Sequence, residues 1–215
     1  MLTLYGDLES GNVYKVRLLL SHLGIPHRRV DVAQMRGEGS HPAFRAVNPI
    51  GKVPTLRFED GRVLSESGAI LFYLARETPF GADDPWGQAQ MLRWMFFEQY
   101  SHEPYIAVNR YILRYAPEAE RAALMSRVPA NHQRGCHALS VMNAHLDANR
   151  WFAGDRYTIA DIALYAYTHT AEEGGFDLAP YPALSDWLRR VGAQPGYLPQ
   201  EHEDSAAPVE FLDPV

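Results

Sequence analysis

Two features of the N-terminal part of the sequence could together hold a short peptide with an anionic end. Pro54 follows Asn48-Pro49-Ile50-Gly51-Lys52-Val53 and begins an apolar segment, so it is expected at a strand start, where its missing N–H costs no ladder bond. A cis Val53–Pro54 bond would turn the Val53 N–H and C=O outward to pair with an extended ligand. Ser67, at an expected helix start, offers free N–H groups to a carboxylate. The alternative is a trans turn proline and an ordinary serine cap.

The elements expected to position these residues follow the order β-α-β-α-β-β-α. Short apolar alternations predict strands at Leu2 and Leu4, Val30 and Val32, Leu56 and Phe58, and Val63 and Leu64. Helical spacing predicts a first helix that contains Val13, Val16, Leu19, Leu20 and Leu23 and ends at Gly24 and Pro26. Short helices are expected near residues 41–44 and from Ser67, and Asp60-Gly61 is a hairpin signal. The order predicts two parallel strands joined by a crossover helix, followed by an antiparallel hairpin.

The rest of the chain is predicted to be helical. We expect a first domain at residues 1–78, a linker at 79–85, a helical domain at 86–198 and a polar, loose tail at 199–215. The helical domain should contain a long helix at 86–115 kinked by Pro104 and a helical pair at 118–149 interrupted at Pro129. Thr158-Ile159-Ala160-Asp161 is expected to open the next helix as a capping box, and a last helix carries Leu184 to Val191.

Composition narrows the class of protein. The 215 residues are 47% hydrophobic and 21% charged, with a formal net charge of -6, which argues against nucleic acid or an anionic membrane as partner. The N-terminus lacks signal-peptide features, and no stretch approaches the roughly 18 apolar residues of a membrane span. The lone cysteine, Cys136, rules out an intramolecular disulfide framework. We therefore expect a soluble, cytoplasmic protein.

Three motifs carry a resemblance to a known family. Asn48 to Leu56, followed by Glu66-Ser67 and its helix, is similar to the glutathione-binding signature of the cytosolic glutathione transferase superfamily. The Thr158–Asp161 motif resembles the helix cap of that superfamily, and Ser10 to Val16 resembles the first loop and helix of its bacterial members. The likeness spans residues 1–197. It implies an α/β thioredoxin-like N-terminal domain, an all-α C-terminal helical bundle and an isologous homodimer.

The resemblance also implies how glutathione, the co-substrate, would be held. Its cysteinyl backbone would pair with Val53 beside a cis Pro54, its γ-glutamyl end with Glu66 and Ser67, and its glycine carboxylate with Lys52 and His41.

Catalysis would need the glutathione sulfur as a thiolate, because the thiolate is the nucleophile. The resemblance puts the activating group in the first loop, at Ser10 and Asn12, whose hydroxyl and amide N–H could both point at the sulfur. Both residue types also cap helices, so a purely structural role is the alternative. Tyr5 and Tyr14 are the rival donors. Tyr5 continues an apolar strand and is expected in the core, whereas Tyr14 could face solvent, the second domain or the ligand.

Other reactive residues are assigned weaker roles. No cysteine lies in residues 7–14, so the reactive sulfur would come from the ligand, and Cys136 is expected to be an inert helix residue. The nine histidines form no HExxH or similar ligand set, and no metal is expected. His102 and Tyr105 (with Glu103) flank Pro104 among aromatic residues and, with Tyr14, are candidates for lining the electrophile pocket.

The predicted function is glutathione transferase activity, in which the glutathione thiolate attacks an electrophilic or disulfide substrate. One alternative is a glutathione-dependent disulfide-bond reductase. The other is a non-catalytic binding or regulatory protein that retains the fold, because fold alone does not fix function. The complete set of Val53, Pro54, Glu66 and Ser67 favours ligand binding.

Overall fold

The computed structural model describes residues 1–209 and divides the chain into two compact units. The first consists of Met1–Ala75 together with the chain from Pro195, and the second of Arg76–Gln194. In the part of the chain that the structure describes, no helix is long and apolar enough to cross a membrane.

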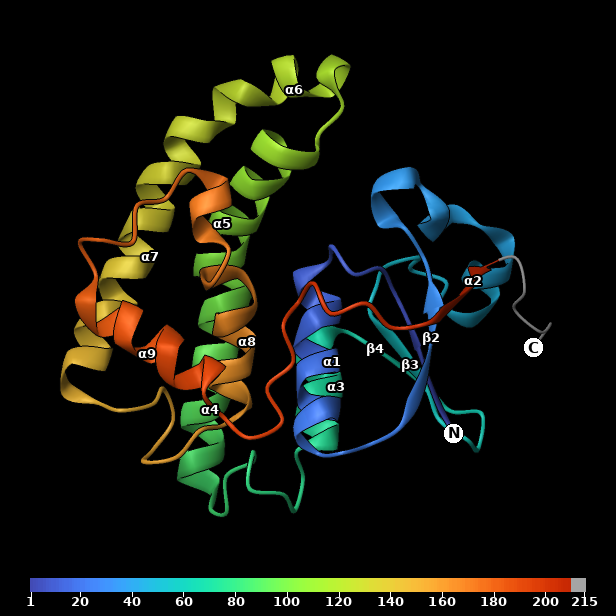
Figure 1. The fold of residues 1–215 in the computed structure, drawn as a ribbon, viewed down its shortest axis with the longest axis horizontal. Coiled ribbons are helices and arrows are strands. Elements are labelled where there is room, and N and C mark those ends of the chain that lie inside the picture. The colour runs from blue at the N-terminus through green and yellow to red at the C-terminus, as the bar shows by residue number, and fades with distance from the viewer. Residues whose placement is uncertain (210–215) are drawn as a thin grey trace. The chain divides into compact units, whose positions relative to one another are not determined.

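The first unit is a mixed sheet flanked by helices (Figure 1). Its elements are β1 (Leu2–Tyr5), α1 (Gly11–His22), β2 (His27–Asp31), the 3₁₀ turns Gln34–Arg36 and Glu38–Ser40, α2 (Pro42–Val47), β3 (Thr55–Arg57), β4 (Val63–Ser65), α3 (Ser67–Leu74) and β5 (Ala206–Pro208). The strand order is β4-β3-β1-β2-β5. β1 and β2 are parallel, and β3 and β4 form an antiparallel hairpin, so the predicted topology is confirmed.

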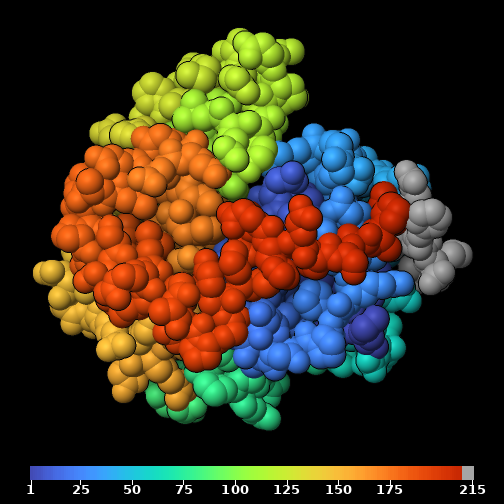
Figure 2. Space-filling view, viewed as in Figure 1, coloured from blue at the N-terminus to red at the C-terminus, as the bar shows by residue number. Residues whose placement is uncertain are grey.

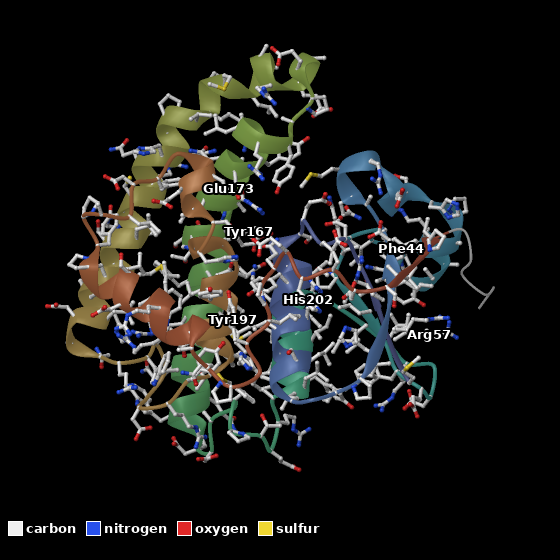
Figure 3. All side chains as sticks on the ribbon, viewed as in Figure 1. Phe44, Arg57, Tyr167, Glu173, Tyr197 and His202 are labelled. Atoms are coloured by element: carbon white, nitrogen blue, oxygen red, sulfur yellow. The ribbon has the colours of Figure 1, made fainter. Side chains whose placement is uncertain are left out.

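Alternation along β1 divides the core of this unit between the two faces of the sheet. Leu4 packs with residues of α1 and α3, which lie side by side on one face (Figure 1). Tyr5 faces the other side and contacts Phe44 of α2, labelled in Figure 3, with the ring centroids 5.9 Å apart. Gly24 ends α1 in the left-handed conformation at φ 62°, which glycine adopts without steric cost.

The C-terminal segment differs from the sequence-based expectation. We predicted a loose tail from Pro199, but residues 199–209 fold onto the first unit, and β5 pairs in parallel with β2. The polar side chains that suggested looseness form hydrogen bonds with the unit instead, as described below. Residues 210–215 of the predicted tail lie outside the described residues.

The second unit is helical. It comprises α4 (Pro85–Phe97), a π-helical turn (Glu98–His102), α5 (Glu103–Arg110), a second π-helical turn (Tyr111–Tyr115), α6 (Glu118–Leu124), a 3₁₀ turn (Met125–Arg127), α7 (Val128–Ala148), α8 (Ile159–Thr168), a 3₁₀ turn (Ala171–Gly174) and α9 (Pro182–Gly192). The first π turn ends two residues before Pro104, which lacks the N–H for a regular helical bond, so the helix predicted for residues 86–115 departs from regular α-helix next to the proline that we expected to kink it. Pro129 lies in the first turn of α7, where a missing N–H is tolerated.

The predicted capping box at the start of α8 is confirmed, and Asp161 does more than cap. One oxygen of its carboxylate accepts from the Thr158 N–H at 3.0 Å. The other accepts from the Phe152 N–H at 3.2 Å and from the Trp187 Nε1–H at 3.0 Å. Because Asp161 is fully buried, these donors replace the water that an ionised carboxylate would otherwise require.

Candidate functional site

Strand register brings the chemically interesting segments of the first unit to one end of its sheet. Tyr5, the last residue of β1, lies opposite Thr55, the first residue of β3. Thr55 in turn lies opposite Ser65, the last residue of β4. The loop after β1, the Val53–Pro54 bond before β3 and the start of α3 after β4 therefore meet at the same edge.

The loop that enters α1 is held by Asp7 and capped by Ser10. The Ser10 N–H donates to Asp7 Oδ1 at 2.8 Å, and the Gln34 N–H donates to Asp7 Oδ2 at 3.0 Å. Burial raises the pKa of the Asp7 carboxyl, although both N–H donors oppose this shift. Ser10 Oγ accepts from the Val13 N–H at 3.3 Å as the helix N-cap. This contact uses an oxygen lone pair and leaves the hydroxyl proton for another acceptor.

Asn12 is oriented by two donors. Its Oδ1 accepts from Lys15 Nζ at 2.7 Å and from Ser67 Oγ at 3.0 Å. An ammonium group can only donate, so the amide oxygen must face Lys15, and the amide NH₂ must point to the other side. Ser67 belongs to α3, so this contact ties the two predicted parts of the glutathione site together.

Lys15 is a functional candidate that we did not predict from the sequence. It is 1% exposed and lies one helical turn after Asn12, and its ammonium group is 2.7 Å from Asn12 Oδ1. Two signals could have indicated it: the i, i+3 spacing from Asn12, and the fact that 18 of the 20 Lys and Arg residues are arginines, which leaves only Lys15 and Lys52.

The start of α3 has the geometry expected of an anion-binding site. Ser67 is the first residue of the helix and is buried. Glu66, which precedes it, has φ 68° and ψ 114°, a conformation that non-glycine residues rarely adopt. Such strain costs about 1–3 kcal/mol and is found preferentially at ligand clamps and active sites. The first N–H groups of α3 have no partner within the helix and point toward its N-terminal end.

The Val53–Pro54 peptide bond is cis, as predicted. Asn48, a buried residue of the Asn48–Leu56 motif, stabilises the chain on both sides of this bond. Its Nδ2 donates to the Lys52 C=O and to Thr55 Oγ1, both at 2.9 Å. Among the described residues, the Val53 N–H and C=O form no backbone hydrogen bond. These two groups remain available to pair with an extended ligand.

Lys52 and His41, the residues suggested for the glycine carboxylate, form fewer contacts with the rest of the site than Asn12 and Ser67 do. The Lys52 side chain is exposed. His41 is the N-cap of α2, and its Nδ1 accepts from the Ala43 N–H at 3.3 Å. This bond places the donor proton of a neutral imidazole on Nε2.

The rival tyrosines are both in the interior. Tyr5 is a core residue, as expected from its strand. Tyr14 has no exposed surface, and its hydroxyl donates to the Leu198 C=O at 2.7 Å, within the first unit. This placement does not favour Tyr14 as a residue of the electrophile pocket.

His102 and Tyr105 belong to the helical unit. His102 is fully buried, and its Nε2 lies 2.9 Å from Thr168 Oγ1. Because the Thr168 hydroxyl donates to the Leu164 C=O at 2.6 Å, His102 must donate to Thr168. Tyr105 is half-buried, with the Arg134 guanidinium 5.5 Å from its ring centroid. Of the candidates for the electrophile pocket, Tyr105 and its neighbour Glu103 have accessible surface, whereas Tyr14 and His102 have none.

Cys136 belongs to the helical unit, on α7. The Cys136 sulfur is 3.7 Å from His132 Nδ1 on α7. Within residues 1–209, no group of three or more His, Cys, Asp or Glu side chains is arranged so that it could hold a metal ion.

Both units of the chain are similar to domains of known proteins. Residues 10–77 match the glutathione S-transferase N-terminal domain, and residues 97–195 match the glutathione S-transferase C-terminal domain. The chain is 31% identical over 191 residues to the disulfide-bond oxidoreductase YfcG of Escherichia coli K12, covering 86% of this chain and 87% of that protein. It is 30% identical over 202 residues to the glutathione S-transferase GstB of the same strain, covering 91% and 95%.

Solved structures extend the agreement to three dimensions. A glutathione S-transferase from Pseudomonas fluorescens Pf-5 is 46% identical with a TM-score of 0.89, covering 94% of this chain and 99% of that one. A theta class glutathione S-transferase from Xanthomonas axonopodis pv. citri, crystallised with glutathione bound, is 28% identical with a TM-score of 0.82, covering 91% and 94%. The chain, with its thioredoxin-like unit and its helical unit, therefore belongs to the glutathione S-transferase superfamily.

Proposed function

We propose that this protein binds glutathione at the sheet edge formed by the α1 loop, Val53 and the start of α3, and that it activates the glutathione thiol for attack on an electrophilic or disulfide substrate. The observation that carries the proposal is the orientation of Asn12. Its amide oxygen is occupied by Lys15 and Ser67, so its NH₂ is directed away from them. Two residues before it, Ser10 has a hydroxyl proton that the helix cap does not use.

The backbone at Val53 and the first turn of α3 supply the binding part. A tripeptide in extended form pairs with the Val53 N–H and C=O in the manner of an added strand. Its γ-glutamyl carboxylate lies at the N-terminus of α3, where the free N–H groups and Ser67 favour a negative charge. Lys52 and His41 are proposed for the glycine carboxylate at the other end.

Ser10 and Asn12 supply the activating part. The bound tripeptide contributes the thiolate nucleophile. The Ser10 O–H and the Asn12 N–H donate to the sulfur and thereby stabilise its charged form, which lowers the thiol pKa below the ordinary value of about 8.5. The N-terminus of α1 acts in the same direction.

Disulfide reduction is the second candidate, favoured by the similarity to a relative named as a disulfide-bond oxidoreductase. The sequence contains one cysteine, Cys136, so the protein has no dithiol of its own to supply electrons. In the balanced reaction, two glutathione molecules reduce one disulfide to two thiols and become oxidised glutathione. The same Ser10 and Asn12 donors would serve this reaction, because the first step is again attack by a thiolate.

Turnover with a panel of second substrates separates the candidates. The purified protein is incubated with glutathione and an aryl halide, an epoxide or a model disulfide, and the conjugate or the oxidised glutathione is quantified. Conjugate formation supports transferase activity, and oxidised glutathione in equal amount to the disulfide consumed supports reductase activity. Saturable glutathione binding without turnover would support a non-catalytic binding protein. No glutathione binding would contradict the whole proposal.

The finer properties that we propose are a cytoplasmic location, detoxification of electrophiles and assembly as an isologous homodimer. Static light scattering at micromolar concentration tests the assembly, and a mass equal to one 24.3 kDa chain would contradict the dimer.

A further inference from the structure

The C-terminal segment is fastened along one face of α1. The Ser21 hydroxyl donates to the Gly196 C=O at 2.8 Å, and Tyr14 donates to the Leu198 C=O at 2.7 Å. Arg17, also on this face, donates to the Gln200 C=O at 3.0 Å and to the His202 C=O at 2.6 Å. Figure 2 shows this segment on the surface of the first unit, and Figure 3 labels His202.

A charged anchor completes the attachment beyond Gln200. The Asp204 carboxylate accepts from Arg17 Nε at 3.3 Å and from Arg29 Nε at 2.5 Å. Both arginine side chains are at least nine-tenths buried, so each is more strongly attracted to its counter-ion than a surface pair would be. β5 follows at once and pairs with β2. The segment from Pro195 to Val209 is thus fixed on both sides of Gln200.

Gln200 connects this segment to the loop that we assign to thiol activation. Its side chain is 4% exposed, and its Nε2 donates to the Leu8 C=O at 3.0 Å and to the Glu9 C=O at 3.2 Å. Carbonyl oxygens can only accept, so the Gln200 amide can adopt one orientation here. Leu8 and Glu9 directly precede Ser10, and the Glu9 carbonyl belongs to the peptide unit that carries the Ser10 N–H.

We propose that Gln200 is a positioning residue for thiol activation, and that the C-terminal segment is a working part of the glutathione site. Asp7 and Gln200 together fix two consecutive peptide units of the α1 loop: Gln200 donates to the carbonyls of Leu8 and Glu9, and Asp7 Oδ1 accepts the Ser10 N–H of the second unit. Without Gln200, the peptide units before Ser10 can rotate, and the Ser10 hydroxyl loses its fixed direction toward the sulfur. Small misplacements of this kind cost up to about 100-fold in rate.

This inference rests on the proposed role of Ser10 in thiol activation, and its test uses two variants of the full-length chain. Gln200→Ala removes both donated hydrogen bonds. Gln200→Glu keeps the size of the side chain but sets a carboxylate against two carbonyl oxygens. Ser21→Ala is the matched control, because it loosens the same segment at a point away from the loop. For each protein, ultraviolet thiolate absorbance of bound glutathione is recorded against pH, together with kcat, KM and the unfolding temperature.

We expect Gln200→Ala to raise the pKa of the bound thiol by about one unit and to lower kcat at neutral pH about tenfold, with Gln200→Glu at least as severe. KM for glutathione should change less than kcat, because Val53 and α3 are untouched. Ser21→Ala should keep the wild-type thiol pKa. A merely structural role for Gln200 would lower the unfolding temperature without moving the thiol pKa, and that result would overturn the inference.

Failure of the proposed function gives a different result. If wild-type protein binds no glutathione, or binds it with an unshifted thiol, the site assignment itself is wrong. If wild-type protein lowers the thiol pKa and both Gln200 variants do the same, only the inference about Gln200 is wrong.

Discussion

Ser67 Oγ donates to Asn12 Oδ1 at 3.0 Å, across 55 residues of sequence. Asn12 belongs to α1 and Ser67 to α3, and each was predicted from a separate motif to act on a different part of glutathione. The contact means that the group proposed to activate the thiol is held in place by the group proposed to bind the γ-glutamyl end.

Substituting Ser10 or Asn12 by alanine should raise the pKa of bound glutathione thiol by about one unit each, because each change removes one donor to the thiolate. Ultraviolet thiolate absorbance against pH measures the shift. Ser10→Ala should also lower stability by about 1 kcal/mol through loss of the N-cap. Ser126→Ala, at an exposed serine of the helical unit, is the control. An unchanged thiol pKa in both variants would assign activation to another donor.

Ser67→Ala should act on binding more than on chemistry. The single hydroxyl proton of Ser67, which is donated to Asn12 in this structure, would turn to the carboxylate of the bound ligand. Alanine removes that bond, and bonds to charged groups contribute about 1.5–3 kcal/mol, so KM for glutathione should rise at least about tenfold. The pKa of the bound thiol should move less than in Asn12→Ala, because Lys15 still orients the amide. Parallel titrations of the two variants make the comparison. A thiol pKa that rises more in Ser67→Ala than in Asn12→Ala would contradict this division of roles.

Lys15→Met should raise the bound thiol pKa as Asn12→Ala does, because the ammonium orients the amide whose N–H is proposed to donate to the sulfur. The effects of the two substitutions should not add, since one acts through the other, and the double variant should resemble Asn12→Ala alone. Lys52→Met is the matched control, at the only other lysine. It should weaken glutathione binding and leave the thiol pKa in place. Full additivity of Lys15→Met and Asn12→Ala would show that Lys15 acts independently of Asn12.

The sequence predicted the strand and helix order and the capping box, because these depend on local patterns, and the family resemblance implied the cis proline. It did not predict Lys15 or Gln200. The Asn12–Lys15 contact needed knowledge of which face of α1 is buried. The Gln200 contact joins residues more than 190 positions apart. The segment that contains Gln200 is polar and has no periodicity, so its sequence does not indicate which part of the fold it contacts. The burial of His102 was missed for a related reason, because it depends on helix packing.

Asp161 should make the stability of the helical unit depend on pH. Burial raises the pKa of its carboxyl from 3.8 to about 6, against the N–H and O–H donors that favour the charged form. Between those values the folded state binds the proton more tightly than the unfolded state, so the contribution of this carboxyl to the free energy of unfolding falls as pH rises. A shift from 3.8 to about 6 corresponds to about 3 kcal/mol.

The Asp161→Asn variant isolates this contribution. The difference in free energy of unfolding between wild-type protein and Asp161→Asn should shrink as pH rises from about 4 to about 6, and should then stay level. Chemical denaturation at a series of pH values gives this difference. Asp155→Asn, at an exposed aspartate, serves as control. A difference that grows over the same interval would mean that Asp161 is stabilised as the carboxylate with a lowered pKa.

The most direct test of the glutathione site is the thiol pKa of glutathione bound to the wild-type protein. Ultraviolet thiolate absorbance is followed as glutathione is titrated into the protein at a series of pH values, with S-methylglutathione as the blank that binds without a free thiol. We predict saturable binding and a bound thiol pKa at least about one unit below the ordinary value of about 8.5. Saturable binding with the pKa of the free thiol, or no saturable binding, would contradict the account.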